Sequence, residues 1–212
     1  MSSLRELVII GAGGFGREIL AWARHSFGYE TEWRVKGFLD DNVAALNAFP
    51  APAPVLGTIK DYSPKSNEVF ICGLGIPNLR EKFSNLISER GGEFIQLIHR
   101  TAVLGNEVSL GSGTVLCPYS LVSSNATVGQ GVAVNYHSSV DHDVQVGRWT
   151  QISCHCDITA SVRLGDKVFL GSSVSIIPHI KVGDGAYLGA GSVVIRDVPA
   201  GARVVGNPAR QI

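Results

Sequence analysis

Net charge, cysteine and long apolar stretches are all scarce in this chain of 212 residues. Lys and Arg together number 18 and so do Asp and Glu, which makes the net charge zero. Without a basic excess, nucleic acid and anionic membranes are poor candidates for partners. No apolar run reaches the roughly 18 residues of a membrane span, and the N-terminal residues lack the cleavage site of a signal peptide. We therefore expect a cytoplasmic protein.

Cysteine occurs only at Cys72, Cys117, Cys154 and Cys156. The triplet Cys154-His155-Cys156 invites interpretation as a metal site, but two cysteines at a spacing of two do not match zinc-ligand pairs. We expect buried or half-buried thiols and no metal.

Glycine, in contrast, is abundant, with 25 residues. It follows no Gly-X-Y triplet, which excludes collagen and indicates a fold with many tight corners. Apolar residues make up 45% and charged residues 17% of the chain, which excludes a disordered chain. The length allows one large domain or two small ones.

The first half of the chain alternates strands and helices. We expect strands at residues 6–11, 33–39, 68–72 and 94–98, and helices at residues 17–23 and 78–90. This order predicts a small parallel sheet with helices on its faces, a Rossmann-like α/β domain.

The second half repeats every six residues. All seventeen residues taken at this interval from Ile98 to Val194 are Leu, Ile or Val, and the next residue is Gly in eight cases. Neither a helix nor a single strand has this period. A coil with a short strand, a corner and one inward aliphatic side chain per six residues does. We expect the glycines to relieve the corners, where the backbone needs unusual dihedral angles.

Rows such as Val-Gly-Arg-Trp-Thr-Gln (146–151) and Leu-Gly-Asp-Lys-Val-Phe (164–169) resemble the hexapeptide repeat of left-handed β-helix acyltransferases. In that family three hexapeptides form one coil, so residues 18 apart stack. The tail Val-Gly-Asn-Pro-Ala-Arg (205–210) resembles the closing segment of CoA-dependent members. Joined to the Gly-Ala-Gly-Gly-Phe-Gly loop (11–16), the whole chain resembles the sialic-acid O-acetyltransferases (NeuD type) and the bacillosamine and perosamine N-acetyltransferases.

This resemblance implies a Rossmann-like nucleotide-sugar-binding domain over residues 1–96 and a left-handed parallel β-helix over residues 97–212. It implies an acetyl-CoA-dependent N-acetyltransferase for a nucleotide-linked amino sugar, a homotrimer, and a role in surface polysaccharide biosynthesis. O-acetylation of a sialic-acid-like sugar is the closest alternative. A nucleotide-binding scaffold without catalysis and an NAD-dependent enzyme are the others.

His142 is the candidate general base. It lies two residues after the inward Val140, beside Asp143, and its neighbours 18 residues away, Ser124 and Ala160, are small. A carboxylate partner orients an imidazole and stabilises its charged form. The resembled family carries its base in a matching acid-His-acid motif, which assigns His142 as the base and Asp143 as its orienting acid.

The resemblance also assigns residues to acetyl-CoA and the sugar. We expect acetyl-CoA to contact Gln151, Ala160, Ala190, Gly191, Gly206, Asn207 and Pro208, with a backbone N–H near Ala160 stabilising the oxyanion. Gln151 stands where some family members have a second His, which puts the positioning of the acetyl group in question. Asn135 is a candidate substrate contact. His137 and His155, 18 apart, should stack, and we expect packing or a cleft edge there rather than a metal.

The glycine-rich loop is the candidate nucleotide site. Gly11, Gly13 and Gly16 fit an NAD fingerprint, but about 96 residues are too few for a dinucleotide domain with a hydride-transfer site. The family match instead assigns Gly13, Gly14, Phe15 and Asp41 to a nucleotide-sugar, with Asp40 the neighbouring candidate. Gly73 begins a second loop of this kind, and Arg80 suits either a diphosphate or an ion pair.

Overall fold

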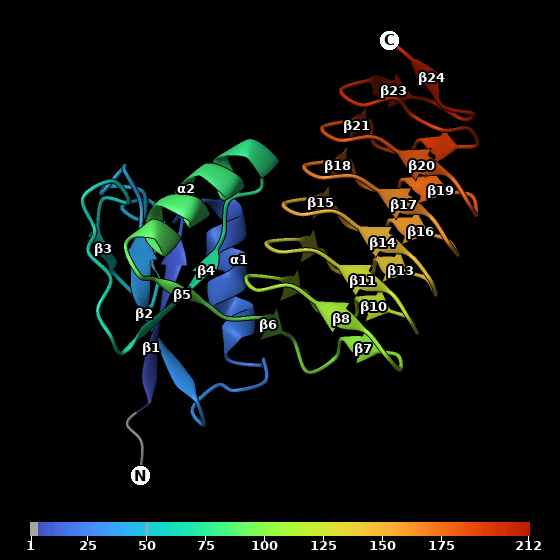
Figure 1. Ribbon diagram of the computed structural model, residues 1–212. Coiled ribbons are helices and arrows are strands. Elements are labelled where there is room, and N and C mark those ends of the chain that lie inside the picture. Colours follow the sequence, from blue (N-terminus) through green and yellow to red (C-terminus); the bar gives the residue numbers. More distant parts are fainter. Residues whose placement is uncertain (1–3, 50) are drawn as a thin grey trace. The chain divides into compact units, whose positions relative to one another are not determined.

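The computed structural model describes residues 4–49 and 51–212. The chain divides into two compact units, unit 1 over residues 1–97 and unit 2 over residues 98–212, where the sequence suggested a boundary after residue 96 (Figure 1). In the described part of the chain, no helix combines the length and apolar character needed to cross a membrane.

Unit 1 is a parallel sheet of five strands in the order β3-β2-β1-β4-β5, as expected of a Rossmann-like domain. Its elements are β1 (Arg5–Ile10), α1 (Gly14–Ala23), β2 (Trp33–Leu39), β3 (Val55–Gly57), β4 (Glu68–Cys72), α2 (Pro77–Glu89) and β5 (Glu93–Phe94). The chain moves from β1 to β2 on one side, and β4 then pairs with β1 on the other. The loops after β1 and β4 therefore meet at a topological switch point, where open α/β sheets bind ligands.

The sequence located most of these elements to within a few residues. It missed β3, because Val55–Gly57 has only three residues and no alternating pattern. The single strand expected over residues 94–98 was wrong, because two separate strands of two residues each lie there. Strand β5 belongs to the sheet of unit 1, and β6 (Leu97–Ile98) belongs to a sheet of the solenoid.

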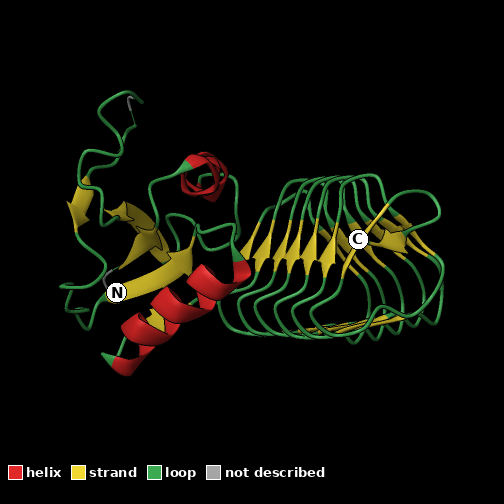
Figure 2. Ribbon diagram, turned by 90° about the horizontal axis from the view of Figure 1, so that it is seen from above, coloured by secondary structure: helices red, strands yellow, loops and turns green. Residues whose placement is uncertain are grey.

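Unit 2 is a left-handed parallel β-helix, as predicted, with its two-residue strands stacked on three faces (Figure 2). Face A contains β7 (Val103–Leu104), β10 (Leu121–Val122), β13 (Ser139–Val140), β16 (Asp157–Ile158), β19 (Ser175–Ile176) and β22 (Val193–Val194). Face B contains β8 (Ser109–Leu110), β11 (Thr127–Val128), β14 (Gln145–Val146), β17 (Arg163–Leu164) and β20 (Lys181–Val182). Face C contains β6, β9 (Val115–Leu116), β12 (Ala133–Val134), β15 (Gln151–Ile152), β18 (Phe169–Leu170), β21 (Tyr187–Leu188), β23 (Arg203–Val205) and β24 (Arg210–Gln211).

The aliphatic ladder of the sequence forms the core of this solenoid. From Leu116 to Val194 every sixth residue is buried, and partners such as Val122 and Val140 pair 18 residues apart. At the start of the ladder Leu104 is 42% exposed, while Ile98 and Leu110 are partly buried against the core. The inward row is therefore complete only where a coil packs on both sides.

The expectation that glycines relieve the corners holds for Gly113, Gly131, Gly185 and Gly191, which have positive φ, and is wrong for the glycines that follow the ladder. The glycines directly after the ladder residues have no positive φ; at seven of these eight, all but Gly189, the next coil passes so closely that a Cβ would collide with its backbone. For Gly129 that atom would lie 2.8 Å from the Arg148 nitrogen. The left-handed conformation falls two residues later, mostly on non-glycine residues such as His137 (φ 57°) and Asp143 (φ 61°).

Gly129→Ala should therefore destabilise the protein by about 1–3 kcal/mol, the usual cost of overpacking. Gly185 has φ +65° but open space where a Cβ would stand, so Gly185→Ala should cost about 1–2 kcal/mol, from the left-handed conformation alone. Urea denaturation of both variants measures the two losses. Because Gly129 has no positive φ, a loss well below about 1 kcal/mol for Gly129→Ala would mean that close coil packing is not what requires glycine at position 129.

Candidate active site

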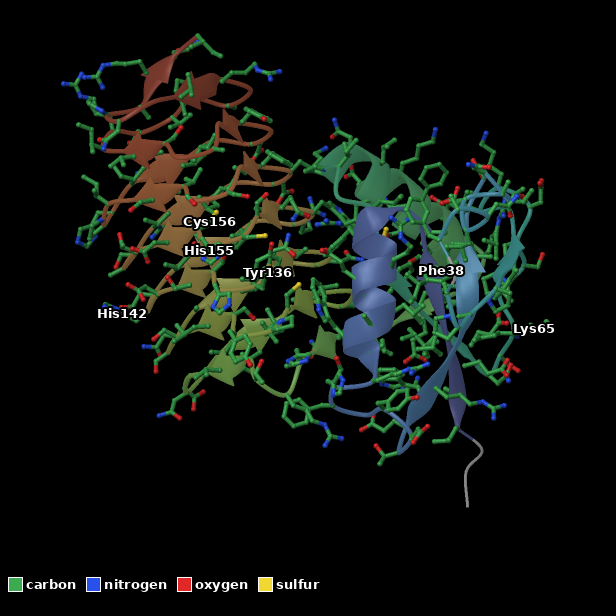
Figure 3. The ribbon with its side chains drawn as sticks, turned by 180° about the vertical axis from the view of Figure 1, so that it is seen from behind. Phe38, Lys65, Tyr136, His142, His155 and Cys156 are labelled. Carbon is green, nitrogen blue, oxygen red and sulfur yellow. The ribbon has the colours of Figure 1, made fainter. Side chains whose placement is uncertain are left out.

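His142 lies at the corner between face A and face B, called corner AB here. The chain leaves β13 at Val140, and Asp141, His142 and Asp143 make the corner before the strand β14 begins. The imidazole is 57% exposed, and in Figure 3 it projects outward from the solenoid. Strand β13, from which the corner starts, pairs in register with β10 and β16 of the two neighbouring coils. This pairing holds the backbone near His142 in place without any contact to its side chain.

The imidazole of His142 is oriented by its neighbour. Nδ1 of His142 lies 2.8 Å from Oδ2 of Asp143. The other carboxylate oxygen accepts a hydrogen bond from the Asn125 amide, one coil away, at 3.3 Å. The hydrogen bond with His142, followed by that from Asn125, lowers the pKa of Asp143, so the carboxyl is ionised near neutral pH. An ionised Asp143 favours the tautomer with its proton on Nδ1, which leaves Nε2 as an acceptor facing solvent.

The next coil places a free backbone donor beside His142. Ala160 occupies the same corner position one coil along, and its side chain ends at Cβ. Among the residues that the structure describes, none accepts a hydrogen bond from the Ala160 N–H. Adjacent coils lie about 4.8 Å apart. An acceptor atom placed over the corner can thus meet Nε2 of His142 and the Ala160 N–H together.

Other expected site residues lie at the corner between face C and face A, called corner CA. Asn135 follows β12, and its Oδ1 accepts a hydrogen bond from the Cys117 thiol at 3.3 Å. Ala190 and Gly191 follow β21 at the same corner, and both are exposed. Gln151 lies in β15 on face C itself. Within one chain, the structure brings none of these four residues to the corner of His142.

The closing segment of the solenoid contains the remaining residues expected to contact acetyl-CoA. β24 turns back antiparallel onto β23, and the turn between them holds Gly206, Asn207 and Pro208, with a cis bond before the proline. The Val193 N–H donates to the Gly206 carbonyl and the Ala209 N–H donates to the Val193 carbonyl, so the turn is tied to face A. Asn207 and Pro208 are exposed.

The stacking of His137 and His155 is confirmed, with ring centroids 5.2 Å apart and an interplanar angle of 6°. Tyr119 continues the column at 5.1 Å from His137, and Tyr136 meets both imidazoles edge-on. Across residues 4–49 and 51–212, no three His, Cys, Asp or Glu side chains gather closely enough to hold a metal ion.

The cysteines are free thiols, three of them buried and Cys154 half-buried. Burial raises the pKa of Cys156 to about 11, which keeps that thiol protonated at neutral pH. A protonated, buried thiol is a poor nucleophile.

In unit 1, the glycine-rich loop lies at the switch point of the sheet. Gly11 has φ +95°, and a Cβ on Gly16 would collide with the Gly11 carbonyl, so these two glycines let α1 pack tightly against the end of β1. Gly13 and Gly14 have open space where a Cβ would stand. Gly13 is the N-cap of α1 and offers no side chain to cap it. The first N–H groups of the helix are therefore available to an anion.

The two acidic residues after β2 hold the surrounding loops. Asp40 accepts hydrogen bonds from the Ala12 N–H and the Asn42 N–H, both at 2.8 Å. Asp41 accepts one from the Ile59 N–H at 3.0 Å, and its other oxygen lies 3.5 Å from Lys60 Nζ. Asp40 thus fixes the glycine-rich loop directly, while a nucleotide contact for either residue stays a prediction.

Gly73 and Arg80 build the second loop at the switch point. A Cβ on Gly73 would lie 2.6 Å from the Gly16 Cα, so this glycine serves close packing. Arg80 is only 1% exposed; its Nε donates to the Leu74 carbonyl at 2.9 Å, and its guanidinium lies 5.9 Å from the Phe15 ring centroid. In this position Arg80 holds the loop after β4 beside Phe15, and its contact with a diphosphate stays a prediction.

Two residues near the candidate sites were missed by the sequence analysis. Asn125 supports Asp143, and counting back 18 residues from Asp143 would have found it. Arg17 donates to the Ala12 carbonyl at 3.2 Å, and its guanidinium lies 3.9 Å from the Phe49 ring centroid. No pattern in the sequence indicates that pair.

Comparison with protein families gives one match in each unit. Residues 6–87 match the PglD N-terminal domain, and residues 161–196 match the bacterial transferase hexapeptide family (six repeats). No curated protein matches the sequence significantly.

Solved structures match the chain over nearly its whole length. The acetyltransferase domain of PglB from Neisseria gonorrhoeae FA1090, in complex with acetyl coenzyme A, is 27% identical with a TM-score of 0.89, covering 99% of this chain and 100% of that one. PerB from Caulobacter crescentus, in complex with CoA and GDP-perosamine, is 25% identical with a TM-score of 0.88, covering 99% and 98%. WeeI from Acinetobacter baumannii AYE is 26% identical with a TM-score of 0.86, covering 97% and 99%.

Proposed function

Because the chain belongs to the NeuD-like sugar acetyltransferases, we propose that it transfers the acetyl group of acetyl-CoA to the amine of a nucleotide-linked amino sugar. The observation that carries the proposal is the exposed His142–Asp143 pair, with a free N–H at Ala160 one coil away. The PglB domain binds acetyl-CoA, and PerB binds CoA with a nucleotide-linked sugar. Both support this choice of donor and acceptor.

His142 acts as the general base in this proposal. Its Nε2 accepts a proton from the sugar amine as the amine nitrogen attacks the thioester carbonyl carbon. Asp143 holds Nδ1 and stabilises the imidazolium that forms. The Ala160 N–H donates to the carbonyl oxygen as it becomes negative. When the C–S bond breaks, the imidazolium returns its proton to the leaving sulfur, so no covalent enzyme intermediate is needed.

The remaining donor-site residues fit the same scheme. Ala190, Gly191 and the Gly206–Pro208 turn present small side chains and backbone groups at one edge of the solenoid, where a long, flexible donor such as CoA can lie. Gln151 replaces a charged imidazole with a neutral amide, which can still donate a hydrogen bond to the acetyl oxygen. Asn135 belongs to corner CA with these residues rather than to the corner of His142.

Unit 1 binds the nucleotide in this proposal. The uncapped start of α1 at Gly13, Gly14 and Phe15 offers N–H groups to the phosphates, and Gly13 and Gly14 leave room for them. Asp40 keeps that loop in place through the Ala12 N–H. Asp41 retains one carboxylate oxygen whose contact, Lys60 at 3.5 Å, is exposed and weak, so a ribose hydroxyl can compete for it.

The acceptor is tested by release of free thiol from acetyl-CoA with UDP-, dTDP- and GDP-linked amino sugars, each beside free sialic acid. We expect at least one nucleotide-linked amino sugar to react much faster than sialic acid. The uncapped start of α1 in unit 1 can bind the phosphates of a nucleotide, and free sialic acid has none. Turnover of free sialic acid without binding of any nucleotide-sugar would instead indicate an O-acetyltransferase. NADH binding in unit 1 would indicate the dehydrogenase alternative.

His142→Ala should lower kcat by about 10²–10⁴, the usual contribution of a positioned general base. The melting temperature should stay nearly unchanged, because the imidazole lies outside the core. The acidic limb of the pH–rate profile should be absent in His142→Ala. Asp143→Asn should cost less, and should move that limb to lower pH because the imidazolium loses its anionic partner.

His137→Ala is the matched control, since His137 is also exposed at a corner but stacks on other rings. It should retain most activity. Near-normal turnover of a folded His142→Ala protein would falsify the assignment of the base and direct attention to His137 and His155.

We also propose that the active protein is a homotrimer. Of the expected acetyl-CoA residues, Ala190 and Gly191 lie at corner CA, whereas Ala160 and the base lie at corner AB, and two copies of the chain can bring one of each corner together. Closed cyclic symmetry is the usual solution for such contacts. Sedimentation should give a mass three times the 22.5 kDa of the chain. A monomer that keeps full activity would contradict this.

A further inference from the structure

The carboxylate of Asp143, which meets the imidazole of His142, is itself held by the coil before it. Its Oδ2 lies 2.8 Å from Nδ1 of His142, and its Oδ1 accepts a hydrogen bond from Nδ2 of Asn125 at 3.3 Å. In the described part of the chain, no other hydrogen bond or ion pair reaches this carboxylate. The side chain of Asp143 is 50% exposed. Half exposed and with two contacts, it can turn toward solvent when either contact is lost.

The stacked backbone aligns the carboxamide with the carboxylate. The Asp143 N–H donates to the Ser124 carbonyl at 3.1 Å, and the Asn125 N–H donates to the Asn106 carbonyl at 2.9 Å. Asn125 and Asp143 both have φ 61° and lie one coil apart, a step of about 4.8 Å. Their side chains therefore leave the backbone from equivalent conformations, and Asn125, Asp143 and His142 form a short chain of contacts along corner AB.

The backbone conformation alone does not account for an asparagine at position 125. Glu107, Ser161 and His179 occupy the same corner position in other coils, with φ of 55°, 60° and 66°. The left-handed turn thus accepts several residue types here. The hydrogen bond from Asn125 is also exposed, and water replaces such a bond at little cost to folding. Its effect on Asp143 is the remaining explanation.

We propose that Asn125 is a positioning residue, which keeps the carboxylate of Asp143 turned toward Nδ1 of His142 and so keeps Nε2 available as the proton acceptor. Asn125 acts through Asp143 and touches neither substrate. The inference rests on the proposed function for what the imidazole does in turnover. Its effect on the imidazole itself is measured without substrate.

Loss of the carboxamide has two opposite effects on a protonated His142. A carboxylate released from Asn125 spends less time at Nδ1, which removes an anionic partner from the imidazolium. The same carboxylate no longer shares its charge with a second donor, which strengthens the contact whenever it forms. We expect the first effect to be larger, because an exposed donor at 3.3 Å withdraws little charge. The midpoint of the His142 titration should therefore move to lower pH.

Other titratable groups near this corner are the same in all the variants below. Asp141 precedes His142 in the chain, and Asp157 on β16 accepts a hydrogen bond from the Ser139 hydroxyl at 2.6 Å. Glu107 and His179 lie two coils from Asp143 on either side, about 10 Å away. A change in the titration of His142 is thus attributable to the substituted residue.

NMR of protein labelled with ¹⁵N at histidine reports the tautomer and titration of His142 without turnover, with its signals identified by their loss in His142→Ala. Asn125→Gly removes the carboxamide, and glycine accepts the left-handed backbone. It should lower the share of the tautomer with the proton on Nδ1 and move the midpoint to lower pH, both by less than Asp143→Gly. Added to Asp143→Gly, it should change neither, since without the carboxylate the two sites no longer interact.

Ser161→Gly is the matched control. Ser161 has φ 60° and lies at the same corner position on the other side of Asp143, and its hydroxyl has no hydrogen-bond partner among the residues that the structure describes. This variant should keep the tautomer and midpoint of the wild type. In turnover, Asn125→Gly should lower kcat about three- to tenfold, the usual worth of one hydrogen bond. The KM of both substrates should stay nearly unchanged, and the acidic limb of the pH–rate profile should move to lower pH.

The inference and the proposed function can fail separately. If Asn125→Gly leaves the tautomer and midpoint unchanged or raises the midpoint, or if Ser161→Gly alters them as much, the inference is wrong. It is also wrong if Asn125→Gly has its full effect in the absence of the Asp143 carboxylate, or if kcat is unchanged although the imidazole responds. If the imidazole responds as expected but no amino sugar is acetylated, the proposed function is wrong and the positioning of His142 by Asn125 stands.

Discussion

The close approach of successive coils is the constraint on which unit 2 depends. Backbone N–H and C=O groups pair between neighbouring coils, and at seven of the eight glycines that directly follow ladder residues a Cβ would collide with the backbone of the next coil. Glycine fills many of these positions for that reason. The corners then take the left-handed turn two residues later, on side chains that project outward. The same geometry therefore creates both the core and a set of outward-facing corner residues.

Rigid register turns a linear sequence into parallel columns of side chains. Asn125 reaches Asp143, and Ala160 follows His142, only because their positions differ by 18 residues. A side chain that acts on a ligand needs a fixed direction, and for His142 this direction comes from the stacked backbone and from Asp143 rather than from burial. This is why an imidazole 57% exposed to solvent can still be well oriented.

The sequence predicted this architecture because its strongest signal, one inward aliphatic residue in six, is also the physical requirement of the core. It assigned the left-handed corners to glycine, whereas most of them fall on other residues, since a hydrophobic period carries no information on φ. The analysis missed Asn125, although it lies 18 residues before Asp143, because Asn125 is not one of the ladder residues. The burial of Arg80 could not be predicted either, as a charged residue after a loop is usually exposed. The period also gives no sign that Ala190 and Gly191 lie at another corner than His142 within one chain.

An exposed ion pair such as His142–Asp143 adds little to the stability of a corner. Asp143 also has φ 61°, a conformation that asparagine, aspartate and glycine tolerate best. That conformation turns the carboxylate toward the preceding imidazole, at 2.8 Å, and toward Asn125. The pair is therefore explained by what it does to the imidazole, which is to favour the proton on Nδ1 and leave Nε2 as an acceptor, rather than by what it adds to folding. A corner residue that the solenoid needs only for its backbone thereby becomes the group that orients the imidazole of His142.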